Sequence, residues 1–238
     1  MDFTYQRVVL KISGEALSGA QKTGIDFEFV TKLANILKKI HEKDIQIGIV
    51  VGGGNFWRGR TSGHMNRVKA DHMGMLATVM NGIALTDCLD EVGVKNALMT
   101  TIGFPQIGEL YSPERAIKHL ENNEIVVFGY GTGSAFFSTD TAASLRASEI
   151  GADIILKATT IDGVYTSDPK IDSTAQKYKT LSFDEMLNKN LKVIDSTAAS
   201  MCRDNKIPVK IFSINPVENI LNMFNNSSDF SEIGTLIF

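Results

Sequence analysis

The sequence has little cysteine, no excess of positive charge and no long apolar run. Its two cysteines, Cys88 and Cys202, lie far apart among 238 residues. This argues against a disulfide framework or a cysteine metal site and favours a reducing, cytoplasmic setting. The formal net charge is -3 and no cluster of Lys and Arg occurs, so we expect no nucleic-acid ligand. Asp2 and polar residues precede only a short apolar run, a start that is typical of neither a signal peptide nor a membrane span.

Familiar phosphate-binding and metal motifs are also absent. Gly14 and Gly19 have Walker A spacing, but Ala20-Gln21 follow where Lys and Ser or Thr are required. The dinucleotide fingerprint would need a glycine at the position of Phe136. Neither the H-R-D nor the D-F-G signature of protein kinases occurs. The four histidines show no ligand pairing at helical spacing, which disfavours a zinc hydrolase, and we assign no metal ligand.

Strand-like and helix-like segments alternate along the chain. Short β-branched runs at 7–12, 45–51, 125–128 and 209–212 predict buried strands, and apolar residues at helical spacing between them predict helices. This alternation is typical of a three-layer α/β/α sandwich with a mainly parallel central sheet. With 43% hydrophobic residues and no long linker, we expect a single domain spanning residues 1–238.

Several helix ends have specific signals. Asp26 is placed to cap a helix, Ser112-Pro113 begins another, and residues 182–185 (SFDE) match a capping box. Thr139 with Asp140 predicts a further cap. Residues 235–238 predict a strand at the edge of the sheet.

A long helix is predicted over residues 71–89, and Asp71 is a candidate for its cap. Its apolar face contains Met73, Leu76, Met80 and Ile83. We interpret this face as core or as a subunit contact.

Two glycine-rich stretches follow predicted strands. Gly52–Gly54 comes directly after 45–51, and Gly131 begins a stretch in which a glycine turn leads to a helix start marked by hydroxyl groups and an acid. Backbone N–H groups at loops and helix starts bind anions, and parallel sheets bind ligands at the carboxyl ends of their strands. The sequence therefore predicts phosphate binding at these loops.

Four separated blocks together resemble one known family. They are VVLKISGEAL with Lys11, VVGGGNFWRG with Arg58, ADHMGMLATVMNGIAL with Asp71, and TGSAFFSTD with Asp140 followed by LKATTIDGVYTSDP. The combination resembles the bacterial uridylate (UMP) kinases of the amino-acid kinase superfamily. The similarity extends into residues 191–212.

The resemblance implies the amino-acid kinase fold and roles for the matching residues. Lys11, Arg58 and Asp140 would serve the transfer, with Asp140 orienting the lysine. The residues implied to bind ATP are Lys11, Ile12, Ser13, Gly14, Gly54, Arg58, Thr159, Tyr165 and Asp168. Those implied to bind UMP are Gly53, Asp71, Thr132, Gly133, Ser134, Ala135, Phe136, Phe137, Ser138 and Thr139. The segment that matches the site of GTP activation is Gly19, Ala20, Gln21, Lys22, Thr23 and Gly24.

The implied reaction is ATP + UMP → ADP + UDP, with Mg²⁺ accompanying ATP. Such a transfer depends mainly on positioning and positive charge. A phosphate acceptor has a second pKa of about 6 and is already nucleophilic at neutral pH, so it needs no strong general base. The resemblance also implies a homohexamer and feedback inhibition by UTP.

Other interpretations stay open. Lys11 is also compatible with a solvated strand end, Gly52–Gly54 with a tight turn, and Arg58 with Asp71 as a surface ion pair. Phe136 and Phe137 suit core or pocket walls better than base stacking. As alternative functions we consider a superfamily relative that phosphorylates a carboxylate or carbamate, and a non-catalytic nucleotide sensor.

Overall fold

A computed structural model describes residues 5–59, 63, 65–169, 171–225, 230 and 232–238. The strands in these residues are β1 (Arg7–Ile12), β2 (Gln46–Val51), β3 (Asn96–Thr100), β4 (Glu109–Leu110), β5 (Ile125–Gly129), β6 (Ile154–Thr159), β7 (Thr180–Leu181), β8 (Val209–Ser213) and β9 (Thr235–Ile237). The helices are α1 (Gly14–Leu17), α2 (Phe27–His41), α3 (Arg67–Glu91), α4 (Pro113–Glu121), α5 (Thr139–Ile150), α6 (Phe183–Asn188), α7 (Ser196–Asp204) and α8 (Asn219–Asn222), with a 3₁₀ turn at Gly19–Gln21.

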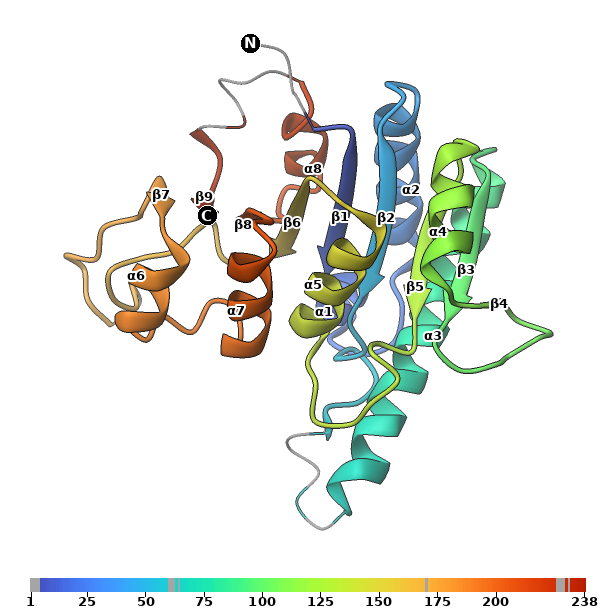
Figure 1. Cartoon of the computed structure of the whole chain (residues 1–238), viewed down its shortest axis with the longest axis horizontal. Coiled ribbons are helices and arrows are strands. Elements are labelled where there is room, and N and C mark those ends of the chain that lie inside the picture. Colours follow the sequence, from blue (N-terminus) through green and yellow to red (C-terminus); the bar gives the residue numbers. More distant parts are fainter. Residues whose placement is uncertain (1–4, 60–62, 64, 170, 226–229, 231) are drawn as a thin grey trace.

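The described strands form one sheet, in the order β4-β3-β5-β2-β1-β6-β8-β9-β7 (Figure 1). Neighbouring strands pair in parallel except at β8 and β9, which are antiparallel. The predicted mainly parallel α/β sheet is confirmed. The predicted edge position of residues 235–238 is wrong, because β9 lies between β8 and β7. Edge positions depend on pairing between distant segments, which a local pattern does not encode.

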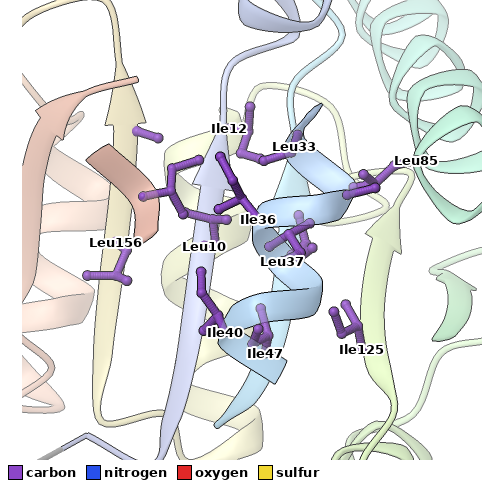
Figure 2. Close-up of a cluster of buried hydrophobic side chains, with 14 of the residues drawn as sticks. Leu10, Ile12, Leu33, Ile36, Leu37, Ile40, Ile47, Leu85, Ile125 and Leu156 are labelled. Carbon is purple, nitrogen blue, oxygen red and sulfur yellow. The ribbon is translucent and has the colours of Figure 1, made fainter. Parts of the chain in front are cut away.

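Two apolar clusters, one on each face of the sheet, make the three layers. In β1, Val8, Leu10 and Ile12 join the cluster of α2, while Val9 joins the cluster of α5. Figure 2 shows how α2 covers the first face, with Leu33, Ile36, Leu37 and Ile40 lying against side chains of the central strands. Because side chains alternate along a strand, Lys11 lies on the face of Val9, toward α5.

Three of the predicted helix starts are confirmed. The Asp26 carboxylate accepts the Phe29 N–H at 3.1 Å, Ser112 caps α4, and Ser182 forms a complete capping box with Glu185. Each side chain satisfies an N–H that the first helical turn leaves without an intrahelical partner.

Two predicted caps are wrong. Helix α3 begins at Arg67 and Asn66 caps it, so Asp71 lies one turn inside the helix. Helix α5 is capped by Ser138, whose hydroxyl accepts the N–H groups of Asp140 and Thr141. Ser138 is the last residue with an extended backbone, whereas Thr139 is already helical. The Asp140 carboxylate is therefore free of the capping role.

The apolar face of α3 is not core. Four residues at helical spacing are each 37 to 49% exposed, namely Met73, Leu76, Met80 and Ile83. The opposite face of α3 packs on the sheet through residues such as Leu85 and Leu89. The predicted core role of this face is therefore wrong, and its role as a subunit contact stays a prediction. None of the described helices combines the length and the apolar character that a membrane crossing requires.

Candidate active site

Two glycine loops meet at the carboxyl ends of β1 and β2. The Gly52 N–H donates to the Ile12 carbonyl at 2.9 Å. A Cβ atom on Gly14 would lie 2.6 Å from the Gly54 nitrogen, and one on Gly52 would lie 2.9 Å from the Gly14 nitrogen. Side chains at these positions would push the loops apart, so glycine is what permits their contact. The backbone N–H groups of both loops are thereby gathered at one end of the sheet.

Beside these loops lies a cleft of about 550 Å³, which we call the larger cleft. Its walls come from the ends of β1, β2 and β6, from α3, and from the segment that precedes α5. The predicted site residues that line it are Lys11, Ser13, Gly14, Gly53, Gly54, Arg58, Asp71, Thr132, Ser134, Phe137, Ser138, Thr139 and Thr159. Residues separated by up to 148 positions in the sequence, from Lys11 to Thr159, thus share one cavity.

Other predicted residues lie beside the larger cleft or away from it. Of the predicted catalytic and substrate-binding residues, those outside its lining are Ile12, Gly133, Ala135, Phe136, Asp140, Tyr165 and Asp168. Ile12 is fully buried in the core below the loops. Tyr165 and Asp168 lie on the loop that follows β6, where the Tyr165 hydroxyl donates to Asp162 at 2.9 Å. The side chain of Phe136 is 64% exposed and that of Phe137 is 51% exposed, so neither is core.

Asp71 is held by two separate segments. Both oxygens of its carboxylate accept from the Nε–H of Arg67, each at 2.8 Å, and Oδ2 also accepts the backbone N–H of Phe136 at 2.8 Å. Phe136 has a positive φ of 72°. The segment predicted to bind UMP is thus hydrogen-bonded to Asp71, the residue predicted to bind the ribose. Arg58, which also lines the cleft, forms an ion pair with Glu15.

Lys11, Asp140 and Lys157 form a buried cluster. Lys11 Nζ lies 3.0 Å from Asp140 Oδ1, and Lys157 Nζ lies 2.6 Å from Asp140 Oδ2. The three side chains are only 10 to 15% exposed. Burial by itself raises the pKa of Asp140, but the two ammonium groups outweigh it, so the pKa is below its ordinary value. Asp140 is therefore ionised at neutral pH and holds the Lys11 ammonium at the larger cleft.

Lys157 was not predicted as a site residue. Burial lowers the pKa of Lys157 most, Asp140 opposes this, and the net pKa is below the ordinary value. Its ammonium also donates to the Val193 carbonyl at 2.6 Å. A lysine between Leu156 and Ala158 in a buried strand was the signal available in the sequence. Only the pairing of β6 with β1 shows that this lysine lies beside Lys11.

Asp195 was also missed. It caps α7 by accepting the Ala198 N–H at 2.9 Å, and it hydrogen-bonds to the hydroxyl groups of Ser138 and Thr141. Asp195, Asp140 and Lys157 line a second cavity of about 440 Å³, the smaller cleft, which shares Ser138 and Lys157 with the larger one. The turn between α6 and α7 is therefore part of the site region.

The predicted regulatory segment, Gly19 to Gly24, lies outside both clefts. It is bound to Asn55, the residue after Gly54. The Gly24 N–H and the Thr23 hydroxyl both donate to the Asn55 carbonyl, at 3.1 and 2.9 Å, and the Asn55 amide donates to the Gly24 carbonyl at 2.7 Å. The segment is thus a direct neighbour of the glycine loop.

The described residues contain no group of three or more His, Cys, Asp or Glu side chains that could hold a metal ion. The two acidic side chains that line the larger cleft, Glu15 and Asp71, are each paired with an arginine. Lys11, Arg58 and the loop N–H groups instead suit the oxygens of a phosphate chain. These groups would bind the phosphates of a nucleotide, and a metal ion would enter the cleft already bound to those phosphates.

Comparisons with known proteins agree with this geometry. The model of the amino acid kinase family matches residues 6–213. The structure is similar to that of a UMP kinase from Bacillus anthracis, with a TM-score of 0.92 and 34% identity over 98% of this chain and 96% of the other. It is similar to a UMP kinase from Ureaplasma parvum, with a TM-score of 0.88 and 37% identity over 98% of both chains. A uridylate kinase from Archaeoglobus fulgidus matches with a TM-score of 0.69 and 25% identity over 97% of this chain and 99% of the other.

Proposed function

This chain belongs to the amino acid kinase family, and we propose that it is a kinase that transfers the γ-phosphoryl group of ATP to UMP, giving ADP and UDP. The observation that carries the proposal is the larger cleft, in which two glycine loops, four basic side chains and the segment before α5 meet. Similarity to two UMP kinases over 98% of this chain supports the choice of acceptor.

The two substrates would occupy different walls of the cleft. The ATP phosphates would meet Lys11, Arg58 and the N–H groups of the loops at Ser13, Gly14 and Gly54, with Thr159 on the way to the adenosine. UMP would lie between Gly53, Asp71 and the segment from Thr132 to Thr139. The hydrogen bond from Phe136 to Asp71 supports this, because it fixes the acceptor segment against the residue proposed to bind the ribose. Tyr165 and Asp168, on the loop that follows β6, would contact the adenosine.

In-line transfer needs positive charge at the migrating group. Lys11 would lie between donor and acceptor, held by Asp140, and Arg58 would exchange its ion pair with Glu15 for contact with phosphate oxygens. No side chain has to remove a proton, because the attacking UMP phosphate is largely dianionic at neutral pH. Mg²⁺ would enter with ATP as part of the substrate and neutralise charge on the phosphate oxygens.

A coupled assay of ADP release tests this function. The acceptors to compare under Mg²⁺-ATP are UMP, CMP, dTMP, N-acetylglutamate and carbamate. We expect turnover of UMP above all others; preference for a carboxylate or carbamate would indicate the alternative superfamily reaction. Nucleotide binding without turnover of any acceptor would indicate a sensor and overturn the proposal.

A lysine variant tests the assignment of the site. Lys11→Met should lower kcat about 10²- to 10³-fold, the usual loss when one donor to a developing charge is removed. Lys39→Met, which changes an exposed lysine of α2, is the matched control and should retain full activity. Equal activity of the Lys11 variant and its control would contradict the role of Lys11.

We further propose a cytoplasmic homohexamer in which the exposed face of α3 contacts a second copy of the chain. Met73, Leu76, Met80 and Ile83 form a continuous apolar row on one rigid helix, and the same row on a second copy offers a matching surface. Mass measurement in solution should find a hexamer, and Leu76→Glu with Met80→Glu should yield smaller species. A parent protein of monomer mass would contradict the proposal.

Regulation by nucleotides is a separate proposal. GTP would activate through Gly19–Gly24, since this segment is bonded to the residue that follows the glycine loop. UTP would inhibit as the downstream product. Rates at fixed substrate with added GTP or UTP test both effects, and unchanged rates would refute them.

A further inference from the structure

We propose that Lys157 is a positioning residue for phosphoryl transfer, which restores the positive charge that Asp140 would otherwise cancel at Lys11. The inference rests on the proposed kinase activity. It assigns a role to a buried charged group that the transfer described above does not use.

The placement of Lys157 is set by strand pairing. In the parallel pairing of β1 with β6, Lys11 and Lys157 are direct partners, so their side chains leave the sheet on the same face, toward α5. Asp140 is the second residue of α5, and each of its carboxylate oxygens contacts one ammonium group, Lys11 at 3.0 Å and Lys157 at 2.6 Å. The cluster is therefore symmetric in its contacts, with one acid between two lysines.

The charges of the cluster decide what it presents to a ligand. Lys11 and Asp140 alone sum to zero, and a neutral pair attracts a phosphate chain weakly. With Lys157 the sum is one positive charge. Because the groups are mostly buried, water screens this charge less than it would at the surface. Asp140 can thus hold Lys11 in place while the site stays cationic.

The contacts of Lys157 also keep it in place. A protonated lysine has three N–H donors. Two of them reach Asp140 and the Val193 carbonyl, which ties the cluster to the turn before α7. Among the described residues the third donor has no hydrogen-bond partner, and Lys157 lines both clefts. The ammonium is thus fixed at the boundary of the two cavities, where the phosphates of a bound nucleotide would pass.

A purely structural role must be separated from this one, because breaking a buried ion pair destabilises a protein whatever its function. The distinguishing test is a double-mutant cycle with Lys157→Met, Asp140→Asn and the double variant. Lys157→Met leaves Asp140 to neutralise Lys11, and we expect kcat to fall about 100-fold. In the double variant Lys11 keeps its charge, so we expect turnover at least about tenfold faster than in Lys157→Met.

A double variant that is as slow as Lys157→Met, or slower, overturns the proposal. Lys210→Met is the matched control, since it removes another buried lysine, one that lines neither cleft, and its kcat should equal that of the parent. Circular dichroism checks the fold of every variant. If Lys157→Met does not fold, the turnover of Lys157→Arg is compared with that of Lys157→Gln instead. The arginine variant keeps the positive charge and should turn over at least about tenfold faster. Equal rates of these two variants overturn the proposal.

Calorimetry of Mg²⁺-ATP binding gives a second readout that does not depend on turnover. Binding should weaken about tenfold in Lys157→Met and recover in the double variant, whereas unchanged binding in Lys157→Met overturns the proposal. Parent protein without UMP turnover would refute the proposed function. Parent protein with UMP turnover, but a double variant no faster than Lys157→Met, would refute only the role of Lys157.

Discussion

Replacing Lys210 by methionine should stabilise the protein. Lys210 lies on β8 and is 1% exposed, with its Nζ 4.8 Å from the centroid of the Phe230 ring. In the described part of the chain it makes no hydrogen bond or ion pair. Burial, aided by the charge of Lys177 and opposed by Glu232, lowers the pKa of Lys210 from 10.5 to about 8. The folded state therefore carries the cost of an ammonium group removed from water.

The size of the effect follows from the pKa. One pKa unit corresponds to about 1.4 kcal/mol, so the change from 10.5 to about 8 corresponds to about 3 kcal/mol. Below pH 8 the amine is charged in both the folded and the unfolded chain, and the full cost is present. Between pH 8 and 10.5 the folded protein releases the proton first, so the parent gains stability as pH rises. Imperfect packing of the new side chain costs up to about 1.5 kcal/mol. We therefore expect Lys210→Met to gain about 1 to 3 kcal/mol at pH 7.

Urea unfolding of parent and variant at fixed protein concentration, at pH 7, 8, 9 and 10, measures the difference. Subtracting the free energy of unfolding of the parent from that of the variant cancels the contributions of the other groups that titrate in alkali. This difference should be largest at pH 7 and shrink toward pH 10. Lys39→Met, an exposed lysine, should change the free energy of unfolding by less than about 0.5 kcal/mol at every pH. A variant that is less stable than the parent, or a gain that does not depend on pH, would refute the reasoning.

Three further changes test other parts of the structure. Ser182→Ala removes the capping box of α6 and should lower the free energy of unfolding by about 1 kcal/mol in urea; an unchanged midpoint would contradict the cap's contribution. Asp195→Asn weakens the anchor of the segment before α5 and should raise the KM for UMP about tenfold, with a smaller effect on the KM for ATP; equal effects on both would argue against an acceptor-side role. Burial lowers the pKa of His119, but hydrogen bonds to Glu124 and Glu109 outweigh it and raise the pKa above the ordinary value, so this stabilisation is present below pH 6.5 and is lost as pH rises through the folded pKa. NMR titration should therefore find a lower His119 pKa in Glu124→Gln, and an unaltered titration would contradict the pairing.

The longer strands and several helix starts could be predicted because their signals are local. A short run of β-branched residues followed by glycine is enough to predict the end of β1 and the loop at Gly52–Gly54. Ser182 and Glu185 are likewise three residues apart. The start of α5 was missed because Ser138, Thr139 and Asp140 are all good caps in sequence. Only the backbone conformation of Ser138 decides between them.

The parts of the site that the sequence did not reveal depend on long-range pairing. Lys157 becomes notable when β6 lies beside β1, and Asp195 when the turn before α7 meets Ser138. Each of these residues is unremarkable in its own segment. The position of β9 has the same origin, since it pairs with residues from two other parts of the chain.

The direct pairing of Lys11 with Lys157 links strand registration to the yield of working molecules. Because side chains alternate across a strand, a slip of one residue in β1 or β6 would turn its lysine toward α2, into the apolar cluster and away from Asp140. Under the proposed function, a molecule trapped in that pairing would be inactive rather than slow. The specific activity of a refolded sample, relative to native protein, should then equal the fraction of chains whose central strands are in register. Circular dichroism would not detect the difference, because both pairings have the same content of sheet.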